Sequence, residues 1–318
     1  MADDRDAMRR EVLEGLRLPR KRLPERYHYD RRGSELFEEI TRLDEYYPTR
    51  TERALLERWI PTWVEELAPV ALVELGAGSA EKSRVVLDAM VKHASDILYI
   101  PVDVSGEFLH ETAGQLRSEY EGLLVEPTIA DITRELGLPV DLPEPAWIAF
   151  LGSTIGNFET EAAVRLLRRI AARLRRGDRF LLGADLRPGA HKSKERVELA
   201  YNDAAGVTEQ FSLNLLRVLN RELGSDFDLD SFRYRSFYDD EEGRIETYLD
   251  SLCDQIVHFP DGVEITLTKG ESIRTEISTK YDRRTLDDLF AQSGLVVDRW
   301  VEDERGYYAL VLAALQPA

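Results

Sequence analysis

Between residues 70 and 186, short apolar runs alternate with longer amphipathic segments, and this rhythm limits the fold more than any other feature of the chain. The runs are VALVELG (70–76), DILYIPVDV (96–104), GLLVEPTIAD (122–131), AWIAFLGST (146–154) and RFLLGADL (179–186). Their nearly continuous apolar character is typical of parallel strands covered on both faces. The segments between them, such as SAEKSRVVLDAMVKHA, have the pattern of helices. The sequence therefore predicts an α/β fold with a doubly wound parallel sheet.

Residues 190–280 interrupt this alternation. They begin with a long helical stretch, 193–224, and continue with segments that favour hairpins: SFRYRSFYD, RIETYLDSLCDQIVHF and EITLTKGESIRTEISTKY. The chain then returns to a helix, RRTLDDLFAQSG, and two further strands. We therefore expect two discontinuous domains. A sheet domain would comprise 51–188 and 281–318, and an α+β domain would comprise 1–50 and 189–280.

Two features near the N-terminus predict helices. Residues 1–26 are charged and weakly periodic, which favours a solvated helical arm over a nucleic-acid-binding tail. Thr51 can cap the start of a longer helix, which would carry Leu55, Leu56 and Trp59 on one face.

The charge balance argues against two classes of partner. The chain has 42 Lys and Arg residues against 60 Asp and Glu residues, a formal net charge of −18. A general nucleic-acid binder needs a basic surface to displace counterions from phosphates, and an anionic membrane also attracts basic proteins. We therefore expect neither nucleic acid nor a membrane as a partner.

Cysteine and histidine usage adds further limits. The single cysteine, Cys253, excludes an intrachain disulfide, and the first residues lack the apolar core of a signal peptide, so we expect a cytoplasmic location. The 5 histidines are scattered without the spacing of a zinc site, so no metal is expected. No apolar stretch reaches the roughly 18 residues of a membrane span. No strong dimerisation signal is present, and we expect a monomer.

The first apolar run leads directly into a glycine-containing turn and a helix. Gly76 and Gly78 remove Cβ atoms at the point where a ligand would press on the backbone. The dinucleotide fingerprint would place a third glycine at 81, where this chain has Glu81. The absence of that glycine weakens an interpretation as an NAD site.

Acidic side chains follow the next two runs. Asp103 ends the second run, where a carboxylate can accept hydrogen bonds from ribose hydroxyls, and Asp131 ends the third, where it can meet an adenine amine. Because the carboxyl ends of parallel strands form a crevice at one edge of the sheet, these groups favour S-adenosylmethionine over NAD. The fourth run ends in FLGSTIGNF (150–158), which carries Ser153 and Asn157. The Asn157 side chain offers both a donor and an acceptor, which suits the carboxylate or amine of an amino acid.

Long segments of the chain resemble the histidine Nα-methyltransferases of ergothioneine biosynthesis. They are YDRRGSELFEEITRLDEYYPTRTE, VELGAGSAEKSR, PVDVS, FLGSTIGN, AYNDAAGVT, FSLNLL, NRELGSDFDLDSF and RTEISTKY. The C-terminal helix–strand–turn–strand pattern is similar to the end of a class I methyltransferase fold, whose last strands form a hairpin at the sheet edge. The resemblance implies an enzyme that uses S-adenosylmethionine to add three methyl groups to the α-nitrogen of L-histidine, giving hercynine.

The resemblance also implies roles for individual residues. The family's S-adenosylmethionine contacts match Gly76, Lys82, Asp103, Asp131 and Ile132, and Gly78 and Ser153 lie in the same loops. Its histidine contacts match Tyr46, Asn157, Tyr201, Glu276 and Ser278. Tyr29 matches a tyrosine near the amine, and we expect Tyr29 and Asn157 to act on the reacting group. The ring of Phe37 is a further candidate to face the cationic product.

The two C-terminal candidates have a physical reason to bind an imidazole. Glu276 and Ser278 lie two apart, so on a strand their side chains point to the same face. A carboxylate and a hydroxyl side by side can bind the ring N–H and the other ring nitrogen. An apolar side chain would leave those groups unmatched, which costs affinity.

Two positions depart from the family pattern. Asn202 follows Tyr201 where an aspartate is expected, and Thr247 stands where a methionine would face the substrate ring. The smaller Thr247 keeps open an alternative acceptor, another aromatic amino acid such as tryptophan or tyrosine. A non-catalytic S-adenosylmethionine-binding protein is disfavoured, because a sensor needs no acceptor site.

Overall fold

The computed structural model describes residues 2–139 and 141–317 and divides into two compact units. The large-sheet unit comprises residues 48–193 and 279–318, and the small-sheet unit comprises residues 1–47 and 194–278. Among the described residues, buried hydrophobic side chains form two clusters in the large-sheet unit and one in the small-sheet unit.

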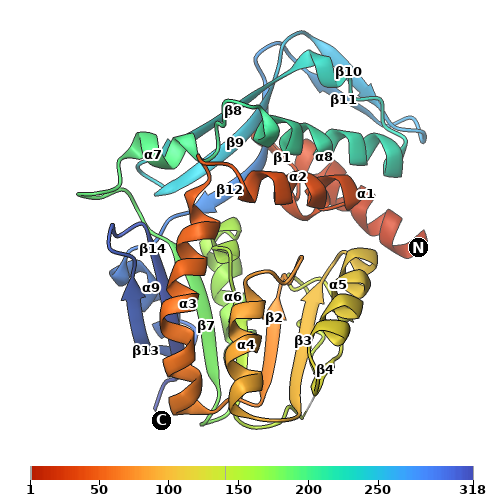
Figure 1. The fold of residues 1–318 in the computed structure, drawn as a ribbon. Helices are drawn as coiled ribbons and strands as arrows, with labels where there is room; N and C mark the ends of the chain where they lie inside the picture. The colour runs from red at the N-terminus through yellow and green to blue at the C-terminus, as the bar shows by residue number, and fades with distance from the viewer. Residues whose placement is uncertain (1, 140, 318) are drawn as a thin grey trace. The chain divides into compact units, whose positions relative to one another are not determined.

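The large sheet has the strand order β13-β14-β7-β6-β2-β3-β4, with β5 beside β3 (Figure 1). Its parallel strands are β2 (Ala71–Leu75), β3 (Ile97–Asp103), β4 (Leu123–Val125), β5 (Thr128–Ile129), β6 (Ala146–Phe150) and β7 (Arg179–Asp185). The last strands, β13 (Leu295–Glu302) and β14 (Tyr308–Leu315), form an antiparallel hairpin, and β14 also runs antiparallel to β7. This order confirms the predicted α/β class, the doubly wound sheet and the mixed edge.

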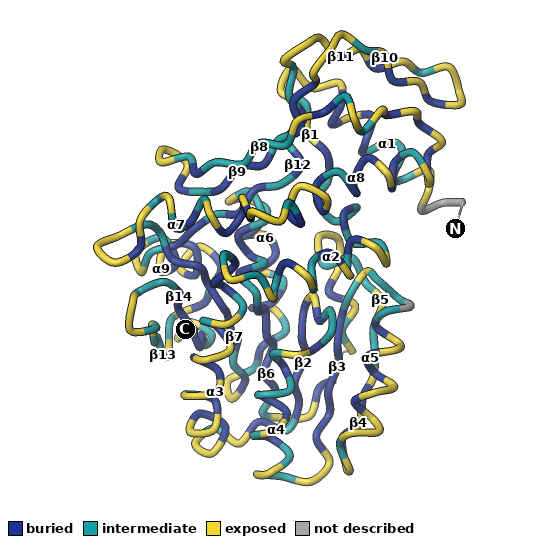
Figure 2. The backbone as a smooth tube through the Cα atoms, turned by 45° about the horizontal axis from the view of Figure 1, so that its top comes forward, coloured by how far each residue is buried: buried dark blue, intermediate teal, exposed yellow. Residues whose placement is uncertain are grey.

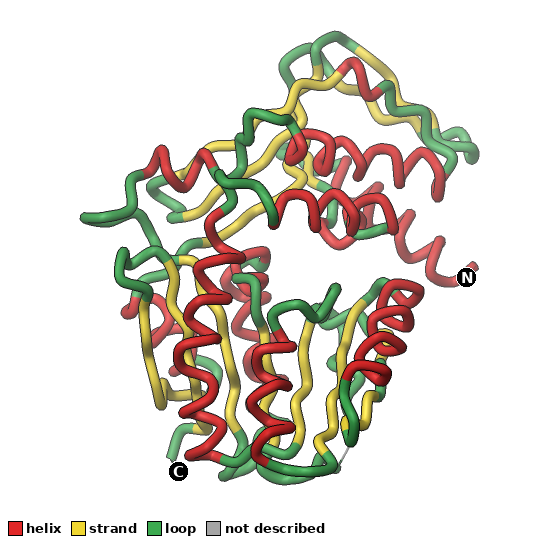
Figure 3. Tube along the Cα trace, in the orientation of Figure 1, coloured by secondary structure: helices red, strands yellow, loops and turns green. Residues whose placement is uncertain are grey.

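Helices cover both faces of the large sheet (Figure 3). One face packs against α3 (Tyr47–Leu67), α4 (Ser83–His93) and α5 (Gly106–Glu119), and the other against α6 (Thr160–Ala171) and α9 (Arg283–Ala291). Along β2, Leu72 packs in the cluster with α3, α4 and α5, and the neighbouring Val73 packs in the cluster with α6 and α9. Successive side chains of a strand point to opposite faces of the sheet, which accounts for this alternation. Because both faces are covered, the central strands are buried along their length (Figure 2).

The small-sheet unit holds a sheet of order β1-β12-β9-β8 and a separate hairpin of β10 and β11. The strands are β1 (Lys21–Arg22), β8 (Phe232–Asp239), β9 (Arg244–Ser251), β10 (Gln255–His258), β11 (Glu264–Leu267) and β12 (Ser272–Thr279). The helices are α1 (Ala2–Leu16), α2 (Arg31–Thr41), α7 (Lys194–Leu199) and α8 (Val207–Leu223), with short 3-10 turns η1 (Glu25–His28) and η3 (Leu229–Ser231).

The prediction of a solvated N-terminal arm was wrong. Helix α1 buries Met8, Val12, Leu13 and Leu16 against the core of the small-sheet unit. These side chains recur at the three- and four-residue spacing of a helix face, and the many charges between them hid that pattern.

Three predicted boundaries also differ. α3 begins at Tyr47 rather than Thr51, because Pro48 fits the first helical turn, where no N–H is needed. The third run divides into β4 and β5 around Pro127, which has no N–H for the ladder. The long stretch 193–224 is two helices, since Asp203 accepts hydrogen bonds from the backbone N–H groups of Val207 and Thr208 and so caps the start of α8.

Candidate functional site

The turn after β2 is open above its backbone. Gly76 and Gly78 have φ angles of +72° and +52°, which favour glycine. A Cβ atom built at either position would meet nothing within 4 Å. The backbone of the turn is bonded to the neighbouring strand β3, since Gly76 N donates a hydrogen bond to Val102 O at 2.8 Å. This exposed stretch of backbone suits a ligand that presses on it.

Asp103, at the end of β3, reaches the same turn. Its Oδ2 accepts a hydrogen bond from Gly78 N at 3.1 Å, and its Oδ1 accepts one from Ser105 N at 3.0 Å. A carboxylate has about four acceptor positions, so Asp103 retains capacity for hydroxyl donors. The predicted pair of a glycine turn and an acidic strand end is therefore in contact.

Asp103→Ala is expected to weaken binding of S-adenosylhomocysteine at least about tenfold, because hydrogen bonds to a charged group contribute about 1.5–3 kcal/mol. Calorimetric titration measures this. Asp88→Ala, which removes a carboxylate from α4 in the same unit, serves as the control and should bind with unchanged affinity. Equal affinity of Asp103→Ala and the unmodified protein would contradict a role at the cofactor.

Lys82 is anchored by a carboxylate that the sequence reading missed. Its Nζ lies 2.7 Å from Oε2 of Glu52, which is fully buried in α3. Glu52 also accepts hydrogen bonds from Gly152 N at 2.9 Å and from the Tyr308 hydroxyl at 2.8 Å. The carboxylate thereby ties Lys82 to the loop after β6. In the sequence, the burial of Glu52 is indicated by its position three residues before Leu55, on the apolar face of α3.

Glu74 is a second buried carboxylate beneath the turn, on β2. It accepts a hydrogen bond from the hydroxyl of Tyr99. Burial raises the pKa of Glu74 to about 7, although the hydrogen bond from Tyr99 and the charge of Lys82 act in the opposite direction. The native state therefore holds this proton more tightly than the unfolded chain does between about pH 4.5 and 7.

Because the pKa of Glu74 is higher in the native state than in the unfolded chain, the free energy of unfolding should fall as the pH rises from about 4.5 to 7. Glu74→Gln mimics the protonated carboxyl group. We expect it to raise the free energy of unfolding by about 3 kcal/mol at pH 8, and by less than about 1 kcal/mol at pH 5. Urea unfolding at both pH values measures the difference. An equal effect at the two pH values would show that Glu74 does not titrate in this way.

Asp131 and Ile132 follow β5 and are half-buried. Oδ1 of Asp131 accepts hydrogen bonds from the backbone N and the hydroxyl of Thr133, at 2.9 and 2.5 Å. Ile132 packs against the core beneath α6. The side chain of Asp131 therefore shapes its own turn, and a contact with adenine stays a prediction.

Ser153 and Asn157 lie on the loop after β6. Ser153 is buried with φ +57°, and its Oγ accepts a hydrogen bond from Asp185 N at 2.9 Å. Asn157 ends the 3-10 turn η2 (Thr154–Asn157). The preceding Gly156 packs so closely that a Cβ there would come within 2.6 Å of Thr279 O. Tight backbone packing thus fixes the position of Asn157 within the large-sheet unit.

The aromatic candidates of the small-sheet unit form a continuous series of ring contacts. Ring centroids lie 5.8 Å apart for Tyr29 and Phe37, 6.3 Å for Phe37 and Tyr46, and 6.2 Å for Tyr46 and Tyr201. Phe211 of α8, which the sequence reading missed, contacts both Tyr29 and Phe37. Edge-to-face pairs of this kind hold rings in fixed orientations. Residues far apart in the sequence therefore build one aromatic wall.

Polar side chains contact Tyr201, the last ring of this series. The Tyr201 hydroxyl donates a hydrogen bond to Ser278 Oγ at 2.8 Å, and the Tyr234 hydroxyl donates one to Tyr201 O at 2.5 Å. Burial raises the pKa of Tyr234, and the negative charge of Glu276 raises it further. Glu276 and Ser278 both lie within β12, as predicted. Tyr234 is a further residue that sequence reasoning missed.

Thr247 is fully buried in β9, and its Oγ1 lies 3.1 Å from Ser236 Oγ on the neighbouring strand. Asn202 has a structural explanation, because its Nδ2 donates to the carbonyl oxygens of Glu198 at 2.7 Å and Ser236 at 3.2 Å. An aspartate could not donate these bonds.

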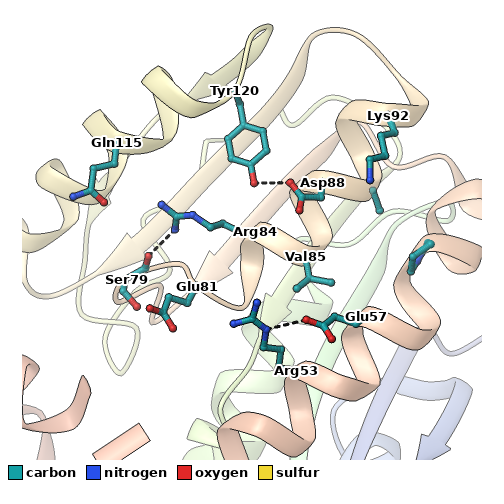
Figure 4. A pocket seen from close by; sticks show the side chains of 12 residues that line it. Arg53, Glu57, Ser79, Glu81, Arg84, Val85, Asp88, Lys92, Gln115 and Tyr120 are labelled. Carbon is teal, nitrogen blue, oxygen red and sulfur yellow. Dashed lines mark hydrogen bonds and ion pairs between the residues drawn. The ribbon is translucent and has the colours of Figure 1, made fainter. Parts of the chain in front are cut away.

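A groove of about 660 Å³ lies over α3, α4 and α5. It includes Ser79 and Glu81 from the glycine turn, but its other walls are surface side chains. Figure 4 shows the hydroxyl of Tyr120 directed at Asp88, with an oxygen-to-oxygen distance of 2.7 Å. None of the predicted cofactor contacts lines this groove. Among the described residues, no group of three or more His, Cys, Asp or Glu side chains could hold a metal ion, and no helix is long and apolar enough to cross a bilayer.

Comparisons with known proteins agree on a family. Residues 8–315 match the model of a family described as histidine-specific, S-adenosylmethionine-dependent methyltransferases. The chain is 38% identical over 311 residues to a histidine N-alpha-methyltransferase of Mycolicibacterium smegmatis, covering 97% of this chain and 95% of that protein.

Two fungal relatives are more distant. Ergothioneine biosynthesis protein 1 of Schizosaccharomyces pombe is 32% identical over 265 residues, which cover 80% of this chain and 32% of that protein. The L-tryptophan methyltransferase trpM of Psilocybe serbica is 30% identical over 337 aligned residues, covering 96% and 92% of the two chains. The family match spans both units and confirms the resemblance seen in the sequence. The chain belongs to the histidine-specific, S-adenosylmethionine-dependent methyltransferase family.

Proposed function

We propose that this enzyme transfers three methyl groups in succession from S-adenosylmethionine to the α-nitrogen of L-histidine, giving hercynine for ergothioneine biosynthesis. The observation that supports this most is the grouping in the small-sheet unit of the residues implied for histidine: Tyr46, Tyr201, Glu276 and Ser278. The names of the mycobacterial and fungal relatives support the same substrate and pathway.

We assign the cofactor to the large-sheet unit. Gly76 and Gly78 would leave room for it above the backbone, Asp103 would accept from its ribose hydroxyls, and Lys82 would bind its carboxylate. Asp131, Ile132 and Ser153 are the further proposed contacts. When bound, the cofactor supplies a methyl group on a sulfonium, which is already a good leaving group. The protein then contributes mainly alignment, with the reacting atoms about 3–3.5 Å apart.

We assign the acceptor to residues of the small-sheet unit. Glu276 would accept the ring N–H of histidine. Ser278, whose Oγ accepts a hydrogen bond from the Tyr201 hydroxyl, would contact the other ring nitrogen. Tyr201 would hold the α-carboxylate end, and Tyr46 and Asn157 are further proposed substrate contacts.

The reacting amine must lose a proton before each transfer, because its free pKa lies above 7. Tyr29 would orient the lone pair or pass the proton to solvent. Each methylation removes an N–H donor and makes the nitrogen bulkier. The ring faces of Tyr29 and Phe37 suit the final trimethylammonium cation, since aromatic faces attract cations.

Incubation with S-adenosylmethionine and L-histidine alone tests the reaction. Mass spectrometry should record gains of one, two and three methyl groups in succession, and fragmentation should place all three on the α-nitrogen. A methyl group on the imidazole ring would contradict the proposal. A denatured sample is the control.

Two observations favour a second acceptor, another aromatic amino acid such as tryptophan or tyrosine. Thr247 is a smaller side chain than the methionine expected from the family, and one relative is named as a tryptophan methyltransferase. We rank tryptophan below histidine because Glu276 and Ser278 both offer polar partners to a ring with two nitrogens.

A further inference from the structure

A fully buried carboxylate, that of Glu52, is paired with the lysine proposed as a cofactor contact. Lys82 Nζ donates to Glu52 Oε2 at 2.7 Å, and both residues belong to the large-sheet unit. The Lys82 side chain is 22% exposed, whereas that of Glu52 is 0% exposed. A ligand can therefore reach this pair only from the side of the lysine.

Groups from two other segments fix the orientation of the Glu52 carboxylate. Gly152 N, in the loop after β6, lies 2.9 Å from both Oε1 and Oε2, and the Tyr308 hydroxyl of β14 donates to Oε1 at 2.8 Å. One of these groups belongs to the backbone, and the other is carried by a fully buried ring. Because neither group can shift far within the packed sheet, the carboxylate offers Lys82 a fixed acceptor.

Two glycines make room for the pair. A Cβ atom built on Gly183, in β7, would lie 1.7 Å from Glu52 Oε1 and 2.7 Å from the Tyr308 hydroxyl. A glycine inside a strand often marks such a close approach. A Cβ atom on Gly152 would lie 2.8 Å from Lys82 Nζ. The ammonium group therefore lies against the loop after β6, although Lys82 itself comes between β2 and α4.

Stability alone gives little reason to bury this ion pair. The cost of removing a carboxylate and an ammonium group from water can exceed the attraction between them, and well-packed apolar side chains often support a fold equally well. A lysine without a fixed partner has a flexible stem, whose rotamer freedom is lost when a ligand binds. A partner that removes this freedom before binding makes the ligand contact stronger.

We propose that Glu52 is a positioning residue for Lys82, which it holds in one rotamer so that the ammonium group meets the carboxylate of S-adenosylmethionine. An ammonium group has three N–H donors, and the contact with Glu52 uses one of them. The inference rests on the proposed function, which assigns Lys82 to that carboxylate. It adds that binding of the amino-acid end of the cofactor depends on Glu52, whereas binding of the adenosine end does not.

Two ligands separate positioning of Lys82 from general support of the turn. S-adenosylhomocysteine carries the carboxylate, and methylthioadenosine has the same adenosine and sulfur without the amino-acid end. Both are titrated by calorimetry into the full-length protein and into Glu52→Gln, which keeps the size of the side chain but not its charge. We expect Glu52→Gln to bind S-adenosylhomocysteine at least about tenfold more weakly, because a contact between charged groups is misplaced. Methylthioadenosine should bind within about twofold of its affinity for the unmodified protein.

Three further variants complete the test. Glu57→Gln removes the charge of an exposed carboxylate on α3, which Figure 4 shows bonded to Arg53, and should bind both ligands normally. Lys82→Met should lose affinity for S-adenosylhomocysteine alone, and adding Glu52→Gln to it should cause no further loss, because both changes act on one contact. If circular dichroism shows that Glu52→Gln does not fold, Tyr308→Phe replaces it. That variant removes one donor to the carboxylate and should show the same selective loss, of about threefold.

Two results would overturn the inference. Equal weakening of both ligands would show that Glu52 supports the turn as a whole, and unchanged or tighter binding of S-adenosylhomocysteine would show that Glu52 only neutralises the charge of Lys82. Either result leaves the proposed function standing when Lys82→Met loses affinity for S-adenosylhomocysteine alone. Normal binding of S-adenosylhomocysteine by Lys82→Met would instead remove the proposed cofactor contact of Lys82, which is part of the proposed function.

Discussion

Glu276→Ala is expected to weaken L-histidine binding about a hundredfold while leaving S-adenosylhomocysteine binding unchanged. The variant loses a carboxylate that would accept the ring N–H, and one such contact is worth about 1.5–3 kcal/mol, or about 2.7 kcal/mol for a hundredfold change. The unmatched imidazole N–H adds to the cost, because a buried donor without a partner is unfavourable. Calorimetry on the protein saturated with S-adenosylhomocysteine measures both affinities.

Two further variants sharpen this test. Glu276→Gln keeps an oxygen that can accept the N–H, so its loss should be smaller than that of the alanine variant. Glu264→Ala removes an exposed carboxylate from β11 of the same unit and should change nothing. Histidine affinity of Glu276→Ala within twofold of the unmodified protein would contradict the assigned contact.

Asp185→Asn is expected to lower the free energy of unfolding by about 3–5 kcal/mol, the cost of breaking a buried ion pair. Asp185 is fully buried at the end of β7, with Lys192 Nζ 2.5 Å and Lys280 Nζ 2.8 Å from its oxygens. Burial alone would raise the pKa of Asp185, but the two ammonium groups lower it below its usual range. Asparagine would leave two buried lysines without their carboxylate.

Guanidinium unfolding, followed by circular dichroism, measures this loss. The control is Asp287→Asn, which breaks an exposed pair with Arg283 at 3.0 Å and should cost less than about 1 kcal/mol. A loss for Asp185→Asn as small as that of the control would show that the cluster does not support the fold.

Much of the large-sheet unit could be predicted from the sequence, because the patterns that mark its strands and turns are local. A buried parallel strand is a continuous apolar run, and the glycines and acids that follow β2 and β3 mark where each run ends. The same locality explains why Gly76, Gly78 and Asp103 could be predicted together. Their contact follows from the parallel arrangement of the two strands.

Residues whose role depends on distant partners could not be predicted in this way. Glu52 meets Lys82, Gly152 and Tyr308, which lie far along the chain, and no local pattern joins them. Phe211 similarly contacts rings from other segments. The resemblance to a family supplied the substrate candidates, such as Glu276, that composition and spacing alone would have placed on a solvated strand.

The most direct measurement of the central claim is a competition among acceptors. The protein is incubated with S-adenosylmethionine and an equimolar mixture of the twenty amino acids, and the products are read by mass. We predict a gain of three methyl groups on histidine alone. Methylation of tryptophan or tyrosine in its place, or no product from protein that binds the cofactor tightly, would contradict the account.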